Sequence, residues 1–219
     1  MRLDLYPTTV LVEQREDPIT PEELSFIEEG DFEFKLAHNY ISTDDRVLEK
    51  KEFSSVKRFI QSCLDKYMEE IFDSPDKLVP TISWINVTQT TQDHPRHDHC
   101  NSFLSGVFYF TDAYTAPINF YNPLPIRWDY TRNNWNINNS DIWSAPVPKN
   151  SLVLFPSYTF HEVLPSSDAN NRISLAFNSF FESEFGSVQN KTRLAHPLFF
   201  KNSESTPPVK ASKLGFKKS

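Results

Sequence analysis

Three histidines and a short Arg-x-Ser motif are the residues of this chain whose types and spacing could do chemistry. His97 and His99 are two positions apart, and side chains at i and i+2 of an extended segment point to the same face. Their Cα atoms would be about 6.6 Å apart, so both rings can reach one ion. His161 could supply a third imidazole and leave open positions on the metal. Arg172 and Ser174 follow on an apolar segment, where they could hold a small carboxylate beside that metal.

Each of these residues also has an ordinary structural interpretation. The His-x-His pair could lie in a polar surface loop, and His161 could be a hydrogen-bonded core histidine. Arg172 could form a structural salt bridge, because a buried guanidinium needs a partner. The combination favours a metal site with a carboxylate anchor next to it. We expect the remaining histidines His94 and His196 to be surface residues.

The segments that must position these side chains have the pattern of short β-strands. Runs rich in apolar and β-branched residues alternate with turns rich in Pro and Asn, and the runs are too short to favour helices. Gly106 lies inside one run, which indicates close approach of a ligand, another backbone or a core side chain. The expected strands cover residues 81–88, 103–110, 117–121, 151–155, 161–164 and 172–181.

The N-terminal part of the chain predicts helical support for those strands. Residues 52–72 repeat apolar side chains at three- and four-residue steps, which is typical of an amphipathic helix lying on a sheet. Thr20 and Glu23, on either side of Pro21, have the pattern of a capping box at a helix start. Residues 3–12 alternate loosely and could form a first strand. We therefore expect a mainly β fold with N-terminal helices, in which residues 1–78 support a jelly-roll core in residues 79–182.

Three stretches around the candidate residues read HDHCNSFLSGVFYF, SLVLFPSYTFHEV and NNRISLAFNSFF. Together they resemble a family of 2-oxoglutarate- and iron(II)-dependent oxygenases that is common in marine phages and bacteria. The resemblance covers roughly residues 84–181. It implies a double-stranded β-helix, the cupin-like jelly roll of that superfamily, which agrees with the strand pattern.

The resemblance also implies a role for each candidate residue. His97 and His161 match the two metal-binding histidines of the family. His99 matches the third ligand, which is Asp or Glu in most of the superfamily. Arg172 and Ser174 match the pair that holds the distal carboxylate of 2-oxoglutarate. No catalytic residue beyond the metal ligands is implied.

Tyr109 matches a position whose hydroxyl often assists that carboxylate anchor. The implied enzyme is a dioxygenase that uses iron(II), 2-oxoglutarate and molecular oxygen, and usually hydroxylates its substrate. His99 departs from the usual set of two histidines and one carboxylate, and three histidines with an open position also suit zinc. The alternative is therefore a jelly roll that is not an oxygenase, with a structural, zinc-binding or ligand-binding role.

Other residues could support such a site. Asn86 and Asn101 could donate hydrogen bonds to the ligand histidines or to the cosubstrate, or could bond within loops. Residues 122–150 form a long insert rich in aromatic residues, and inserts of this length are usually functional or disordered. Three tryptophans of the insert could form a lid over the substrate or pack locally: Trp128, Trp135 and Trp143.

Composition limits the class of protein further. The 219 residues suffice for one sizeable domain, expected in residues 1–200, followed by a basic flexible tail in residues 201–219. The net charge of −7 argues against nucleic-acid binding, which relies on Lys and Arg. The two cysteines make no disulfide framework, and no segment is apolar enough to span a membrane. We expect a cytoplasmic protein, in the host cytoplasm if viral, acting on a peptide or small molecule, with its oligomeric state open.

Overall fold

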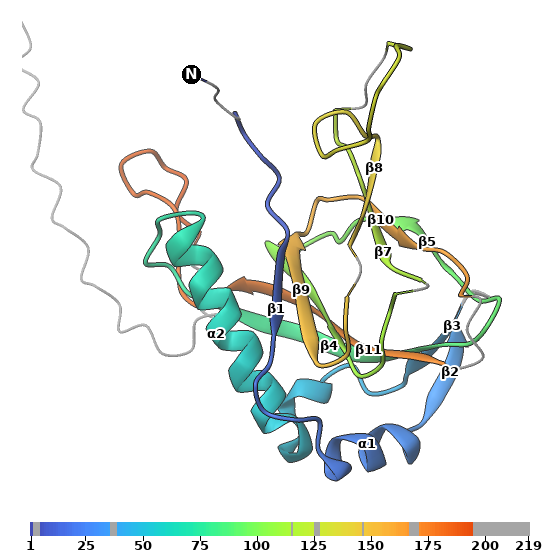
Figure 1. Ribbon diagram of the computed structural model, residues 1–219. Helices are drawn as coiled ribbons and strands as arrows, with labels where there is room; N and C mark the ends of the chain where they lie inside the picture. Colours follow the sequence, from blue (N-terminus) through green and yellow to red (C-terminus); the bar gives the residue numbers. More distant parts are fainter. Residues whose placement is uncertain are drawn as a thin grey trace, which may run out of the picture. The chain divides into compact units, whose positions relative to one another are not determined.

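Two antiparallel β-sheets form the main unit of the protein, shown in Figure 1 as a computed structural model. The structure describes residues 1, 5–35, 39–114, 116–124, 128–145, 147–166 and 171–194. The chain divides into two units, Met1–Glu182 and Ser183–Ser219, and every named helix and strand belongs to the first. In the second unit, Phe185 and Leu194 form an isolated antiparallel bridge.

The seven-stranded major sheet has the strand order β1-β9-β6-β11-β4-β3-β2. All of its neighbouring strands pair antiparallel. Four of the expected strands are here, and the structure confirms them, one with the expected ends and three with ends shifted by up to three residues. The bounds are β1 (Leu11–Gln14), β2 (Phe32–Lys35), β3 (Asn39–Ser42), β4 (Leu78–Thr88), β6 (Leu104–Tyr109), β9 (Ser151–Pro156) and β11 (Arg172–Phe181).

The four-stranded minor sheet has the order β5-β10-β7-β8. Its strands are β5 (His94–His97), β7 (Ile118–Tyr121), β8 (Ile142–Ala145) and β10 (His161–Val163). The two sheets pack through a shared apolar cluster, to which Val153 and Phe155 of the major sheet and Ile118 and Val163 of the minor sheet belong. Two packed antiparallel sheets confirm the expected mainly β jelly roll.

Helices cover the other face of the major sheet. The capping box at Thr20 is present and begins α1 (Pro21–Glu28), as the sequence predicts. The amphipathic helix is α2 (Ser54–Glu70), which lies along the major sheet in Figure 1 and buries Ile60 and Leu64 in the same core cluster as Phe177. Two short 3-10 helices, η1 (Val47–Glu49) and η2 (Lys51–Phe53), lead into α2.

The two-residue period of β11 explains how one strand serves both faces. Leu175 and Phe177 point to the core beneath α2. Ser174 and Ala176, with Arg172 before them, line a cavity on the opposite face. A strand with one apolar and one polar face is therefore enough to carry both the core and the candidate anchor.

Several strands differ from the expectation. The first strand begins at Leu11 rather than at residue 3, and the N-terminal segment adds β2 and β3 to the sheet besides its helices. β5 and β8 also form where none was predicted. Each of the unpredicted strands is four residues long, and β5, with the sequence HPRH, lacks the β-branched and apolar residues that mark a strand. The extended conformation of these segments is therefore set by pairing with a neighbouring strand rather than by local residue preference.

Gly106 is required by core packing and not by a ligand. A Cβ atom there would lie 2.5 Å from two ring carbons of Phe177 and 3.2 Å from the carbonyl oxygen of Val153. We expect Gly106→Ala to lower the free energy of unfolding by about 1–3 kcal/mol, measured by urea denaturation. Gly30→Ala is a matched control with contacts no closer than 3.2 Å, and its loss should be smaller. Equal losses in the two variants would contradict the packing argument.

Two further expectations concern cysteines and membrane spans. Cys63 is buried, Cys100 is exposed, and neither is in a disulfide. Within the described ranges, no helix combines the length and apolar character that crossing a bilayer needs.

Candidate metal centre

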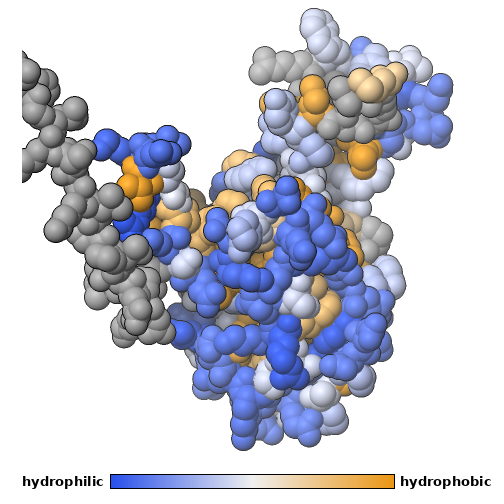
Figure 2. Space-filling model, turned by 90° about the vertical axis from the view of Figure 1, so that its left-hand side faces the viewer, coloured by the Kyte–Doolittle hydropathy of each residue, from blue (hydrophilic) through white to orange (hydrophobic). Residues whose placement is uncertain are grey.

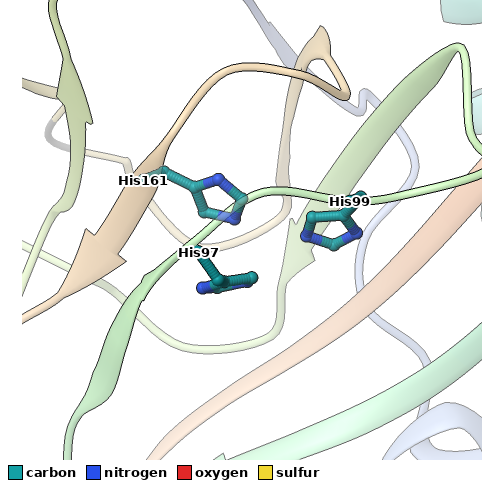
Figure 3. Close-up of side chains that lie close together, drawn as sticks. All are labelled: His97, His99 and His161. Carbon is teal, nitrogen blue, oxygen red and sulfur yellow. The ribbon is translucent and has the colours of Figure 1, made fainter.

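The three histidines singled out by the sequence lie together. His97 ends β5 and His161 begins β10, and the two residues are direct partners in the minor sheet. His99 lies beyond the end of β5, where its backbone N–H donates to the carbonyl oxygen of Ser157 at 2.9 Å. The three rings converge in Figure 3, and one potential ligand atom from each lies within 4.8 Å of the others. The alternation of a single strand therefore does not account for the His-x-His pair, because the strand ends at its first member.

Each imidazole is oriented by a contact at Nδ1. The acceptors are the carbonyl oxygens of Pro95, 2.7 Å from His97, and of Thr159, 2.9 Å from His161. His99 Nδ1 lies 2.6 Å from the side-chain oxygen of Asn178. An acceptor at Nδ1 favours the Nδ1–H tautomer and leaves Nε2 as the atom for a metal. Two nitrogens bound at about 2.1 Å to one ion are at most about 4.2 Å apart, so small ring rotations would complete the site.

The electrostatics favour neutral imidazoles. Burial lowers the pKa values of His97 and His99 below the ordinary histidine value. Burial, with a further contribution from the neighbouring His97 ring, lowers the pKa of His161 to about 3. Neutral imidazole is the form that binds a metal. Asp98 is exposed and does not belong to the cluster, so the donor set found among the described residues is three imidazoles without a carboxylate.

The histidines open into a cavity of about 580 Å³ lined by residues of both sheets. Its lining includes all six residues predicted to bind metal or cosubstrate, a set of three histidines with Arg172, Ser174 and Tyr109. The strand register places Ser174 between Asn86 of β4 and Tyr109 of β6, in one row across the sheet. Arg172 is the next residue of β11 on the same face.

Arg172 is a buried cation with unused donors. Its residue is 6% exposed, and burial lowers the pKa of its guanidinium. One terminal nitrogen donates to the carbonyl oxygen of Ala116 at 3.2 Å, and the other lies 3.5 Å from Thr88 Oγ1. Nε has no partner, and no acidic side chain among the described residues pairs with Arg172. The structural salt bridge is thus not found, and the guanidinium suits an anion that enters the cavity.

Tyr109 belongs to the same end of the cavity. Its side chain is fully buried, and burial raises its pKa above the ordinary tyrosine value, with Arg172 acting in the opposite direction. The phenol therefore keeps its proton and can donate a hydrogen bond.

The two asparagines named as possible supports lie in different places. Asn86 is buried in the cavity wall and accepts a hydrogen bond from Asn39 Nδ2 at 3.1 Å. Asn101 is exposed, has a positive φ of 57°, and does not line the cavity. The residue that supports a histidine is Asn178, which the sequence analysis missed. Asn178 lies four residues after Ser174 and two after Ala176 on β11, so it shares their face, and this spacing was the available signal.

His94 was expected at the surface, and the structure corrects this. It is half-buried, lines the cavity, and stacks on His97 with ring centroids 4.4 Å apart and planes 13° apart. The reason is the unpredicted strand β5, which carries both residues into the minor sheet. His196 lies outside the described residues.

The described residues of the aromatic insert do not line the cavity. The insert projects from the minor sheet beyond β7 and β8 in Figure 1, and hydrophobic and hydrophilic side chains mix on the projecting surface in Figure 2. The three tryptophans proposed as a lid are exposed and absent from the cavity lining: Trp128, Trp135 and Trp143. Trp135 instead packs on Arg132, whose guanidinium carbon is 4.6 Å from the centre of its ring.

Comparison with solved structures supports the fold. The epimerase SnoN from nogalamycin biosynthesis, described as non-heme and alpha ketoglutarate dependent, matches with a TM-score of 0.58 and 12% identity, over 82% of this chain and 79% of that one. HygX from Streptomyces hygroscopicus, solved with nickel, 2-oxoglutarate and hygromycin B, matches with a TM-score of 0.54 and 12% identity, over 78% and 82%. A Pseudomonas putida prolyl-4-hydroxylase matches with a TM-score of 0.51 and 14% identity, over 81% and 94%. No curated protein sequence matches the chain.

A sequence match relates part of the chain to one family. The model of the family described as "Putative 2OG-Fe(II) oxygenase" matches residues 82–178, the stretch that contains the three histidines and the Arg-x-Ser motif. The name of the family gives its cofactor, iron(II), and its cosubstrate, 2-oxoglutarate. Residues 82–178, which include most of the strands around the cavity, are thus similar in sequence to the 2OG-Fe(II) oxygenases.

Proposed function

We propose that the protein is a 2-oxoglutarate-dependent dioxygenase in which the three clustered histidines bind iron(II) and Arg172 binds the distal carboxylate of 2-oxoglutarate. The observation that carries the proposal is the buried guanidinium of Arg172, which lines the same cavity as the histidines and has no acidic partner among the described residues. A metal-chelating diacid satisfies both features at once, because one end can bind the metal and the other the guanidinium. Ser174 and Tyr109 are neighbours in one row of the sheet, and in this proposal their hydroxyls would add hydrogen bonds to that carboxylate.

When bound, iron(II) supplies the oxidation chemistry, in which oxygen and 2-oxoglutarate give succinate, carbon dioxide and an oxidised substrate. The contribution of the chain is binding and orientation. The histidines stay neutral because they are buried, and the apolar side chains of Val107, Ile118 and Val163 line the cavity and limit the access of water.

We further propose that the enzyme hydroxylates a peptide or a small molecule. The cavity of about 580 Å³ lies within the range of about 300–1,000 Å³ typical of sites for drug-sized ligands, so it has room beyond 2-oxoglutarate. The lining continues from Asn86 to Ile41 of β3 and Glu33 of β2, which are successive partners across the sheet. This outer part, with Trp84 and Ile82 of β4, is the place we assign to the substrate.

The experiment that tests the proposal is an anaerobic titration of the purified protein with iron(II) and 2-oxoglutarate. We expect the weak visible charge-transfer band of the chelate to develop, and succinate to form after oxygen is admitted. Binding of iron(II) without any band or succinate would overturn the assignment of 2-oxoglutarate.

The three-histidine donor set supports a second candidate, a zinc-binding jelly roll that is not an oxygenase. A parallel titration with zinc and 2-oxoglutarate separates the two. Tight zinc binding that 2-oxoglutarate does not affect, together with no spectral band for iron, would favour the zinc protein. An affinity for 2-oxoglutarate that depends on the bound metal would favour the oxygenase.

A further inference from the structure

We infer that Asn178 is a positioning residue of the metal centre, which fixes the ring orientation and tautomer of His99 and is itself held by a buried chain of serine hydroxyls. The inference rests on the proposed function, because it treats His99 as a metal ligand. His99 is the residue that stands in place of the carboxylate in the usual set of two histidines and one carboxylate. The inference therefore concerns how the third imidazole of this chain is oriented for a metal.

His99 differs from the other two histidines in how its ring is held. His97 and His161 bond at Nδ1 to backbone carbonyls only two residues earlier in the chain. The acceptor for His99 is a side-chain amide on β11, 79 residues away, at 2.6 Å. His99 also lies outside any named strand, and the contact at its Nδ1 is made by a side chain rather than by a nearby carbonyl oxygen. Its orientation therefore depends on a tertiary contact.

The amide of Asn178 presents its oxygen at this point. Oδ1 accepts from Ser105 Oγ at 2.9 Å and lies 2.6 Å from His99 Nδ1. A rotated amide would turn its NH₂ group toward Nδ1 and favour the other tautomer, in which Nε2 carries the proton and cannot bind a metal. The contact thus selects the Nδ1–H tautomer of His99, and Nε2 keeps the lone pair that a metal needs.

A buried network holds Asn178 in turn. Ser105 and Ser157 are 0% and 1% exposed, and their hydroxyl oxygens are 2.8 Å apart. Ser157 donates to Ser102 at 2.7 Å, and Ser102 donates to the carbonyl oxygen of Leu104 at 3.0 Å. A network of polar contacts in a largely buried region restricts the positions of its members.

The same network positions the backbone of His99. The residue that contacts Ser105 through its hydroxyl, Ser157, also accepts the His99 backbone N–H through its carbonyl oxygen. The ring and the backbone of His99 are therefore both bonded to one cluster. The residues of this cluster come from the start of β6, the turn after β9 and the later part of β11. Loss of Asn178 should free the ring while the backbone stays attached.

Because Asn178 is a neutral acceptor, the chemistry of the two obvious variants differs. Asn178→Ala removes the acceptor, so the free ring can turn and can adopt the other tautomer. Asn178→Asp keeps an oxygen in place and adds a negative charge behind the imidazole, which strengthens a histidine as a metal ligand. A positioning role therefore predicts opposite outcomes for the two substitutions.

The test measures Mn(II) binding by anaerobic calorimetry, with no cosubstrate present. We expect Asn178→Ala to weaken Mn(II) by about 10–100-fold, and Asn178→Asp to bind at least as tightly as the unsubstituted protein. Asn119→Ala is the control. Asn119 is buried and bonded to side chains but does not line the cavity, so the variant should bind Mn(II) as tightly as the unsubstituted protein.

A second readout does not need a metal. Nitrogen NMR of the metal-free, histidine-labelled protein should show His99 protonated at Nδ1 in the unsubstituted protein and in Asn178→Asp, and partly at Nε2 in Asn178→Ala. An unchanged tautomer in Asn178→Ala, or equal loss of Mn(II) affinity in both variants, would overturn the inference. If the unsubstituted protein bound no Mn(II), the proposed function would fail, and the tautomer would still decide whether Asn178 controls His99.

Discussion

Replacing His161 with alanine is expected to abolish measurable metal binding. His161 supplies one of three imidazoles, and its pairing with His97 fixes the distance between two of the ligands. Removing a ligand should lower the metal affinity further than removing a contact behind a ligand does, which costs about 10–100-fold. Calorimetry with Mn(II) under anaerobic conditions would measure the change.

The matched control is His94→Ala. His94 lines the same cavity and stacks on His97, but it is not part of the cluster. We expect His94→Ala to lower the Mn(II) affinity by a factor at least ten times smaller than His161→Ala does. Equal losses would mean that the triad is wrongly assigned.

The fold should survive the loss of His161, although with reduced stability. Its ring is buried and lies with its centroid 4.7 Å from that of Phe155, so some packing is lost. Circular dichroism during urea denaturation should still show one cooperative transition. Loss of cooperativity would instead make His161 a core residue, with metal binding lost only indirectly.

The second large effect is expected for Arg172→Ala, on 2-oxoglutarate rather than on the metal. Truncating one partner of a buried, hydrogen-bonded charge pair costs about 2–5 kcal/mol, or a loss of affinity of roughly 30-fold or more. Mn(II) binding without cosubstrate should be almost unchanged, because Arg172 is not in the histidine cluster. A titration of the Mn(II)-loaded protein with 2-oxoglutarate would measure the effect, and an equal fall in metal affinity would contradict the anchor role.

Two companion variants sharpen this result. Arg172→Lys keeps the charge but not the planar fork, so it should recover only part of the affinity. Arg96→Ala serves as a control, because this arginine stacks on Tyr121 and Phe160 and does not line the cavity. Its affinity for 2-oxoglutarate should match that of the unsubstituted protein.

Stability distinguishes the anchor from a structural salt bridge. Since no acidic side chain among the described residues pairs with Arg172, removing its buried charge should offset the lost hydrogen bond to Ala116, and the cosubstrate-free protein should change little in stability. A large loss of stability on urea denaturation would show that the guanidinium has a structural partner.

The sequence by itself determined the architecture and most of the candidate site. Six strands, α2 and the capping box at Thr20 follow from periodicity and local hydrogen bonding, which are properties of neighbouring residues. The pattern of β11, apolar at every second residue, already separated the core face from the face that carries Arg172 and Ser174. The motif residues then suggested the family whose model matches residues 82–178.

Only the tertiary structure decided which residues meet across long distances in the chain. The contact between His99 and Asn178 depends on the path of the loop after β5 and on the register of β11 against β6, which no local pattern encodes. The position of His94 in the cavity likewise depends on β5 pairing with β10. Local sequence sets the torsional and facial preferences of each segment, whereas the partners of a side chain are set by how the segments pack, and that is a property of the whole fold.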